Sequence, residues 1–215
     1  MEREVLLTGI GGQGVQLAAQ VLARAATLED RHVMLFGVYG GAMRGMNTDA
    51  TVVVGNEPLR TPPLVSRAWS AIAMHDRFWE PVAGKVRAGG LIVVNDATFE
   101  TPLDTSSYEV VRVPATDVAD DLGSSMAGSM VMTGAYLALT GLVTLDGAIE
   151  GMRESVPPYR TQHVAANEAA LRAGYERLEP RGAFPAWAPG GERPAGAKPF
   201  GRSRPGLPGG GVAVR

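Results

Sequence analysis

The sequence contains no cysteine. This absence excludes disulfides, thiolate-held iron–sulfur clusters, cysteine-ligated zinc and a cysteine nucleophile on this chain. The three histidines, His32, His75 and His163, are widely separated and form no pair at helical spacing, so no metal site is predicted. A formal net charge of −2 gives no reason to expect a nucleic-acid partner. Because no basic stretch followed by an apolar stretch opens the chain, we expect no signal peptide and a cytoplasmic protein.

Charge and proline are unevenly distributed along the 215 residues. Residues 180–215 hold six Lys or Arg and one acid, so this stretch carries +5 and residues 1–179 carry −7. Of the 32 residues 180–211, seven are proline and nine are glycine, which leaves too little apolar content for a core. We therefore predict a folded domain over residues 1–179. Residues 180–215 are expected to form a disordered tail, either a solvated appendage or a segment draped over a partner.

Apolar strands alternate with helical segments over the expected domain. This order predicts an α/β fold with a Rossmann-like parallel or mixed sheet, helices on both faces, and further helices toward the C-terminus. The run Met126–Val143 approaches the length of a membrane span, but its glycine, serine and threonine residues favour a buried helix, so no membrane contact is expected. Strands are expected over 4–8, 32–38, 50–54, 68–74 and 90–95, and helices over 15–28, 78–88, 126–143, 144–156 and 163–178.

A glycine-rich turn joins the first expected strand to the first expected helix. Gly9, Gly11 and Gly14 satisfy the pattern G-x-G-x-x-G, in which glycines permit a tight turn and expose a helix N-terminus that favours anions. Dinucleotide binding also requires an acid at the end of the second strand, and that strand ends in Phe-Gly-Val-Tyr. Glu29 and Asp30 precede the strand, on the wrong side. The turn is therefore either a phosphate-binding loop of another kind or a tight connection without a ligand.

A second glycine-rich loop, residues 37–45, follows the second expected strand and contains Arg44. Because ligands of open α/β sheets bind beyond the carboxyl ends of the strands, both glycine loops are expected to face one crevice. There Arg44 would hold a carboxylate or phosphate in bidentate fashion; the alternative is a solvent-exposed side chain. Asp76 and Asp96 stand at strand ends and are expected to cap helices. No nucleophile elbow or P-loop is found, so the chain is expected to need another chain for chemistry.

These motifs resemble, in the same order, those of the gamma-type subunit or domain of the 2-oxoacid:ferredoxin oxidoreductases. The resemblance covers about residues 3–178, and the short-subunit arrangement is most like the beta subunit of indolepyruvate ferredoxin oxidoreductase. Two positions depart from the family pattern: Met46 stands where a second glycine is usual, and Ser129 where an asparagine commonly precedes Met-Val. The resembling segments are Gly9–Gly14, Tyr39-Gly40, Arg44-Gly45, Pro62-Pro63, Ala71–Met74, Gly89–Asn95, Met130–Gly134, and Asn167 with Ala170 and Gly174.

The resemblance implies a subunit of a thiamine-diphosphate-dependent enzyme that is inactive alone. Such enzymes convert a 2-oxoacid, here an aryl or simple one such as indolepyruvate, to acyl-CoA and reduce ferredoxin. Thiamine diphosphate, Mg²⁺ and [4Fe–4S] clusters would lie on partner subunits of a hetero-oligomer, with coenzyme A as co-substrate. Two alternatives stay open: an independent nucleotide-dependent oxidoreductase and a non-catalytic scaffold subunit. The residues implied for the substrate and coenzyme A cleft are Gly11, Gly12, Gln13, Gly14, Tyr39, Arg44, Gly45 and Ser129.

Overall fold

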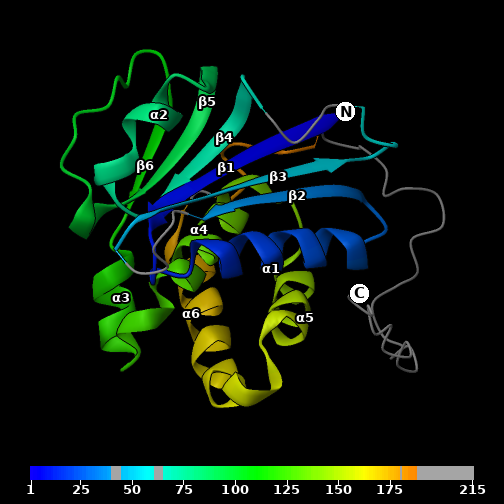
Figure 1. The fold of residues 1–215 in the computed structure, drawn as a ribbon, viewed down its shortest axis with the longest axis vertical. Coiled ribbons are helices and arrows are strands. Elements are labelled where there is room, and N and C mark those ends of the chain that lie inside the picture. Colours follow the sequence, from blue (N-terminus) through cyan, green and yellow to red (C-terminus); the bar gives the residue numbers. More distant parts are fainter. Residues whose placement is uncertain (40–44, 61–64, 180, 188–215) are drawn as a thin grey trace, which may run out of the picture.

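Six strands form one mixed sheet in the computed structural model, which describes residues 1–39, 45–60, 65–179 and 181–187 (Figure 1). The strands lie in the order β2-β3-β1-β4-β5-β6. β3 runs antiparallel to both its neighbours, and the β1–β4, β4–β5 and β5–β6 pairs are parallel. The strands are β1 (Glu2–Ile10), β2 (His32–Tyr39), β3 (Asn47–Gly55), β4 (Ala68–Ala73), β5 (Val86–Asn95) and β6 (Glu109–Val113).

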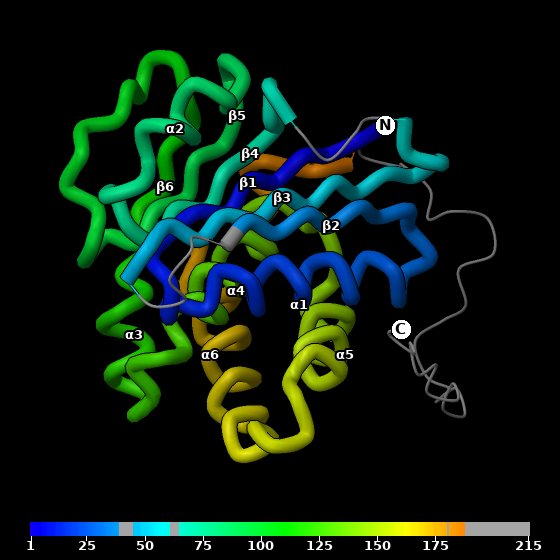
Figure 2. The backbone as a smooth tube through the Cα atoms, in the orientation of Figure 1, coloured from blue at the N-terminus to red at the C-terminus, as the bar shows by residue number. Residues whose placement is uncertain are grey.

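Helices cover the two faces of the sheet unequally. On one face α1 and α4 lie against the strands, and α5 and α6 pack over them as an outer layer (Figures 1 and 2). The opposite face is covered by the short α2 and by the segment around Phe99. The expected mixed sheet with helices on both faces is confirmed. The helices are α1 (Val15–Leu28), α2 (Glu80–Ala83), α3 (Ala115–Asp121), α4 (Gly128–Thr140), α5 (Leu145–Ser155) and α6 (Val164–Arg177).

Helix α4 is the centre of the core. Every residue of α4 is buried, because the helix lies between the sheet and α6. Its fully buried Tyr136 hydroxyl hydrogen-bonds the Ser70 hydroxyl of β4 at 2.9 Å, which satisfies both polar groups. Gly134 allows α6 to approach so closely that a Cβ there would lie 2.0 Å from the carbonyl oxygen of Leu171. The weakly polar run of the sequence is thus a buried helix, as expected.

The connection between β4 and β5 differs from the helix expected over 78–88. It contains only a 3₁₀ turn, Asp76–Phe78, and the four-residue α2. That expectation is wrong because β5 begins at Val86, which pairs with Ala68 before the register shifts. The edge strand β6 and the helix α3 were not expected. Partial exposure of β6 leaves no continuous apolar run in its sequence to mark it as a strand.

Residues 181–187, expected to be part of a disordered tail, pack against the end of α4. The N–H groups of Gly182, Phe184 and Ala186 donate to the last carbonyls of that helix, at 2.7–3.0 Å. The Phe184 ring lies 5.0 Å from that of Trp69. The expectation of disorder is wrong for these residues, because the final carbonyls of a helix lack partners within it and this segment supplies the donors. Residues 180 and 188–215 lie outside the described residues.

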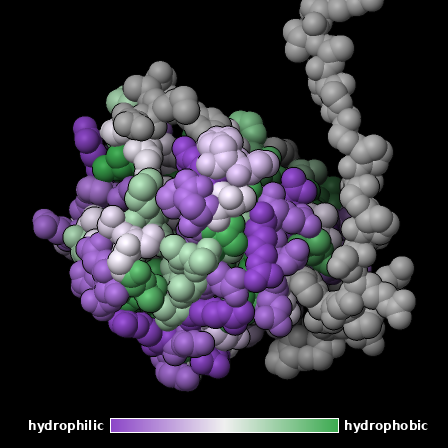
Figure 3. Space-filling model, turned by 90° about the horizontal axis from the view of Figure 1, so that it is seen from below, coloured by the Kyte–Doolittle hydropathy of each residue, from purple (hydrophilic) through white to green (hydrophobic). Residues whose placement is uncertain are grey.

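The outer helical layer presents a mainly hydrophilic surface with small apolar patches (Figure 3). Three ion pairs of α5 and α6 lie there, among them Arg153 with Glu168 at 2.7 Å. Among the described residues, no helix combines the length and apolar character that a bilayer crossing requires. This layer therefore has the mixed polarity of an ordinary protein surface.

Candidate functional site

A crevice forms where the connections after two neighbouring strands leave the sheet on opposite faces. β1 continues into α1 on one face, whereas β4, its parallel neighbour, continues toward α2 on the other. At such a switch point the connections diverge and leave a gap beyond the carboxyl ends of the strands, where ligands of open α/β sheets bind. The glycine turn of residues 9–14 stands on one side of this gap, and Met74 stands on the other.

The glycine turn is held by one amide side chain and one close contact. Gln13 accepts a hydrogen bond from the Ile10 N–H at 2.8 Å and donates one to the Met74 carbonyl at 3.5 Å, so it joins the ends of β1 and β4. Gly14 has φ +80°, and a Cβ there would lie 2.3 Å from the Ser129 hydroxyl oxygen. Both its backbone conformation and its surroundings therefore require glycine. Two predicted site residues, Gly14 and Ser129, meet across the crevice.

The last residue of the second glycine loop lies against the glycine turn. Gly11 donates a backbone hydrogen bond to Met46 at 2.8 Å and accepts one from Gly45 at 3.2 Å. Tyr39 is the last residue of β2, paired with Thr48. The side chain of Tyr39 and the whole of Arg44 lie outside the described part of the chain. The structure thus places Gly45, at the end of the second loop, against the glycine turn.

A hollow of about 140 Å³ lies in the crevice. Two polar lining side chains, Asn95 and Ser129, are buried. Asn95 donates to the Thr116 hydroxyl at 2.9 Å, which holds the end of β5 to the start of α3. Among the lining residues that the structure describes, no side chain carries a charge. The lining includes Gly12, Gln13, Met74, Asn95, Thr116 and Ser129.

Two long helices point their N-termini at this hollow. α1 begins after Gly14 and α4 begins at Gly128; neither has a side-chain cap or an acid in its first turn. Uncapped N–H groups and the helix dipole favour an anionic group at such a position. Gly12, with φ +108°, has no atom within 4 Å of the position that a Cβ would take. The turn therefore leaves its backbone open to a ligand.

A polar network braces the turn from the neighbouring strand. The fully buried Thr8 donates to Asp49 at 2.7 Å, and Asn47 donates to the other carboxylate oxygen at 2.8 Å. Gln16 of α1 donates to the Asp49 carbonyl at 2.8 Å. These bonds join β1, β3 and α1 just below the crevice, and they give the glycine turn a rigid support.

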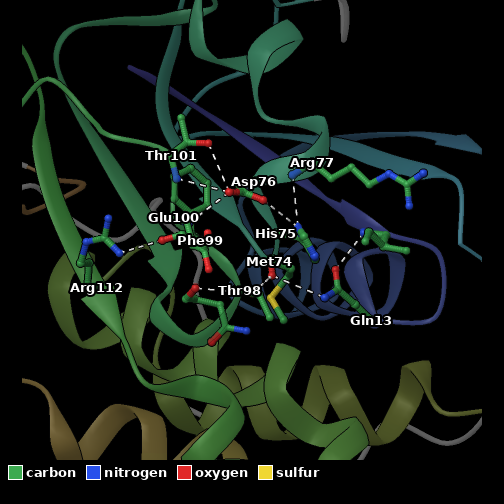
Figure 4. Close-up of polar contacts among 12 residues, drawn as sticks. Gln13, Met74, His75, Asp76, Arg77, Thr98, Phe99, Glu100, Thr101 and Arg112 are labelled. Atoms are coloured by element: carbon green, nitrogen blue, oxygen red, sulfur yellow. Dashed lines mark hydrogen bonds and ion pairs between the residues drawn. The ribbon is translucent and has the colours of Figure 1, made fainter.

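The end of β4 carries a second polar cluster (Figure 4). Asp76 accepts hydrogen bonds from the Glu100 N–H at 3.1 Å, the Thr101 N–H at 3.2 Å and the Thr101 hydroxyl at 3.2 Å, and it lies 3.0 Å from His75 Nδ1. Burial raises the pKa of the Asp76 carboxyl, but these hydrogen bonds outweigh burial and bring its pKa below the usual value. Asp76 is therefore a carboxylate at neutral pH.

The expectation that Asp76 and Asp96 cap helices is wrong. His75 stands at the cap position of the 3₁₀ turn after β4, with its Nδ1 atom 3.1 Å from the Arg77 nitrogen, and Asn95 holds the cap position before Asp96. Asp76 instead ties its turn to the segment after β5, and Asp96 pairs with Arg112 of β6 at 2.9 Å. Each carboxylate finds its partner on another element, which local sequence does not reveal.

A larger, open groove of about 490 Å³ lies elsewhere, between α1, β2 and the end of α5. Val33 and Leu35 form its apolar floor, and Arg24 and Glu154 face each other at 3.9 Å on its rim. None of the described residues of the two glycine loops lines it. We place the functional site in the smaller crevice, where the strand ends, the helix N-termini and the buried polar side chains converge.

The residues of the crevice were only partly foreseen from the sequence. The structure brings together Gly11, Gly12, Gln13, Gly14, Gly45 and Ser129. Sequence reasoning missed Asn95 and Thr116 as neighbours of these residues. The available signal was the position of Asn95 directly after the apolar run of β5, at a strand end. Among the described residues no group of three or more His, Asp or Glu forms a metal site.

The sheet order also bears on dinucleotide binding. β3 lies between β1 and β2, so the end of β2 is two strand spacings, about 9–10 Å, from β1. Glu29 accepts hydrogen bonds from the N–H and hydroxyl of Thr144 at 2.7 Å, at the far end of α1. In the described part of the chain, neither Glu29 nor the end of β2 supplies the acid that a dinucleotide ribose would need.

Comparison with known proteins decides the family. The profile of the pyruvate ferredoxin/flavodoxin oxidoreductase family matches residues 4–177. The chain belongs to this family. The gamma subunit of the keto/oxoacid ferredoxin oxidoreductase from Geobacter sulfurreducens has the same fold, with a TM-score of 0.68 and 24% identity over 81% of this chain and 96% of that one. Pyruvate oxidoreductase subunit PORC of Thermotoga maritima gives a TM-score of 0.65 and 26% identity over the same shares.

Curated relatives of this pyruvate ferredoxin/flavodoxin oxidoreductase family member carry different substrate names. This chain is 32% identical over 185 residues to the 2-oxoglutarate synthase subunit KorC of Methanothermobacter marburgensis. The alignment covers 83% of this chain and 97% of KorC. It is also 33% identical over 155 residues to the ketoisovalerate oxidoreductase subunit VorA of the same organism. That alignment covers 72% of this chain and 31% of VorA. The family is thus shared while the named 2-oxoacid varies.

Proposed function

We propose that this chain is the gamma-type subunit of a cytoplasmic, thiamine-diphosphate-dependent 2-oxoacid:ferredoxin oxidoreductase, and that its crevice forms one wall of the substrate and coenzyme A cleft. The observation that carries the proposal is the family match over residues 4–177. At the switch point of the sheet, the matched domain has a polar crevice between the glycine turn and Ser129. The chain supplies no cysteine for a cluster, which agrees with a division of labour between subunits.

The electrostatics of the crevice support an anionic ligand. The N-termini of α1 and α4 favour negative charge, and both a 2-oxoacid carboxylate and a coenzyme A phosphate carry it. The open backbone at Gly12 would let such a group approach the turn. Arg44, which precedes the Gly45 that contacts the turn, would add a bidentate cation.

The partner subunits would provide the cofactors. Thiamine diphosphate with its Mg²⁺ supplies the carbanion chemistry of decarboxylation when bound there, and [4Fe–4S] clusters carry single electrons to ferredoxin. The overall reaction converts a 2-oxoacid anion and a thiol to a thioester, carbon dioxide, one proton and two electrons. This chain would orient the acid and coenzyme A and exclude water from the cleft.

The substrate we propose is an aryl or simple 2-oxoacid such as indolepyruvate. Relatives are named for 2-oxoglutarate and ketoisovalerate, so the substrate has to be measured. The protein is purified alone and with the products of its neighbouring reading frames, and ferredoxin reduction is followed with indolepyruvate, pyruvate, 2-oxoglutarate and 2-oxoisovalerate, with and without coenzyme A. Activity only in the complex is expected. Turnover by the isolated chain, or a complex inactive on all four acids, would overturn the proposal.

The role of Arg44 has its own test. Arg44→Ala in the complex should raise KM for the oxoacid or coenzyme A about tenfold or more, because a charge-assisted pair contributes about 1.5–3 kcal/mol. Arg24→Ala is the matched control, since Arg24 lies on the rim of the other groove. Unchanged kinetics would remove Arg44 from the site. Loss of association instead of a KM change would favour the scaffold alternative.

The nucleotide-dependent alternative makes a different prediction. It requires NAD(P) or FAD to stabilise the isolated chain against heat, since a ligand that binds the native state alone raises Tm. The position of β2, separated from β1 by β3, disfavours that outcome. We expect no Tm shift with either nucleotide.

A further inference from the structure

An aspartate–histidine pair lies at the carboxyl end of β4, directly after a residue that lines the crevice. His75 follows Met74, whose carbonyl accepts from Gln13 at 3.5 Å and from the Thr98 hydroxyl at 2.6 Å. The Nδ1 atom of His75 lies 3.0 Å from Asp76. In Figure 4 the imidazole lies between the Asp76 carboxylate and the glycine turn that carries Gln13. The pair therefore belongs to the same sheet edge as the candidate site.

Three hydrogen bonds hold one oxygen of the Asp76 carboxylate. This oxygen accepts from the Glu100 N–H and from both the N–H and hydroxyl of Thr101. The other oxygen is thereby aimed at His75. The side chains of Asp76 and His75 are 22% and 29% exposed, so the pair is sheltered but still reachable from solvent. A held carboxylate beside a reachable imidazole is the arrangement that orients histidines for proton transfer.

The hydrogen-bond pattern assigns the imidazole tautomer. Nδ1 lies 3.0 Å from a carboxylate oxygen, which can only accept, and 3.1 Å from the Arg77 N–H, which can only donate. The two bonds exclude each other, and the charge-assisted one is the stronger, so Nδ1 carries the proton and donates to Asp76 instead of accepting from Arg77. The Nε2 lone pair then points away from the carboxylate. Within the described part of the chain Nε2 makes no hydrogen bond or ion pair, which leaves it available to a ligand.

We propose that His75 Nε2 accepts the thiol proton of the acyl acceptor, with Asp76 as its positioning residue; this inference rests on the proposed function. The reaction of a 2-oxoacid anion with a thiol releases one proton, and that proton comes from the S–H group. As the carbon–sulfur bond forms, the S–H bond breaks and its proton moves to Nε2. The two electrons leave for the one-electron acceptor, ferredoxin. Imidazole is the side chain whose proton affinity suits this exchange near neutral pH.

The charges around the imidazole are few. On its own turn they are Asp76 and the Arg77 guanidinium, which lies 5.4 Å from the Phe78 ring. The carboxyl end of β1, which packs against the turn, carries no titratable group. The adjacent α2 contributes Glu80, and the segment after β5 contributes Glu100. The carboxylate in contact is thus the charge that orients His75.

The test separates the two halves of the reaction in the holoenzyme complex. His75→Asn removes the proton acceptor and places a residue favoured at helix N-caps before the 3₁₀ turn. We expect thioester formation to slow about 100-fold or more, while carbon dioxide release without coenzyme A, measured with an artificial one-electron acceptor, stays within twofold. The fall in thioester formation at low pH, where an imidazole becomes protonated, should disappear. Asp76→Asn should give a smaller loss in the same step.

Controls keep the outcomes distinct. His163→Asn, in the exposed segment before α6, should change neither half-reaction. Equal loss of both half-reactions with an unaltered pH profile would make His75 a structural cap and overturn the inference. Unchanged thioester formation in His75→Asn would also overturn it. A wild-type complex with no 2-oxoacid activity would instead overturn the proposed function itself, so the two failures differ.

Discussion

The contact between α4 and α6 permits a quantitative prediction. Gly134 and Gly174 lie reciprocally against the facing helix: a Cβ on either would stand 2.0 Å from a backbone carbonyl oxygen, that of Leu171 or of Val131. Ordinary van der Waals contact begins near 3.4 Å, so Gly134→Ala forces the helices more than an ångström apart. The obstacle is backbone, which cannot rotate away as a flexible side chain would.

Two opposing terms set the magnitude. Alanine improves helix propensity by about 1 kcal/mol. Overpacking costs about 1–3 kcal/mol, and the backbone obstacle at Gly134 places the cost at about the upper end. The net loss for Gly134→Ala is therefore about 2 kcal/mol, which lowers Tm by about 4–8 °C for a domain of this size. Gly134→Ala with Gly174→Ala should cost less than the sum of the two, because one displacement relieves both overlaps.

Thermal unfolding followed by circular dichroism measures this loss. Gly84→Ala is the matched control, since Gly84 has φ −68° and no atom within 4 Å of a Cβ. It should leave Tm unchanged or raise it slightly. If Gly134→Ala melted at or above the temperature of the Gly84→Ala protein, the close approach of the two helices would be refuted.

Three further predictions concern stability. Tyr136→Phe leaves the buried Ser70 hydroxyl without its partner and should cost about 1–3 kcal/mol, part of which Ser70→Ala should restore; urea unfolding measures both. Hydrogen bonds from Ser106 lower the pKa of Asp104 to about 2. NMR titration should therefore find this carboxyl still ionised at pH 3. Because its pKa is depressed, its contribution to stability is present above about pH 4 and disappears as pH falls toward 2. Truncation after residue 179 removes three backbone hydrogen bonds to α4 and should cost about 3 kcal/mol, which urea unfolding measures.

Local pattern predicted much of the fold. The bounds of α1, Val15–Leu28, match the expected helix, because a glycine turn precedes it and its apolar residues recur at helical spacing. The buried strands β4 and β5 were found from continuous apolar runs. The connection between them was misjudged, because a short stretch compatible with a helix lost to the pairing of Val86 with Ala68. Tertiary pairing overrides weak local propensity.

The candidate site was foreseen in part. Both glycine loops follow strands, so the general rule for open α/β sheets predicted one crevice for them, and the structure describes Gly45 beside Gly11. Asn95 and Thr116 were not associated with them, because they are 21 residues apart and their hydrogen bond depends on the packing of α3. His75 was weighed only as a metal ligand and Asp76 as a cap, since the donors that hold the carboxylate, on residues 100 and 101, come from a distant segment.

The sequence by itself determined the family, the α/β class and the glycine turn, because each depends on residues close together in the chain. Only the tertiary structure decided that β3 separates β2 from β1, that Ser129 meets Gly14, and that residues 181–187 lie on the end of α4. Those three facts join segments far apart in sequence, whose meeting is set by burial and by the need of strand edges and helix ends for hydrogen-bond partners.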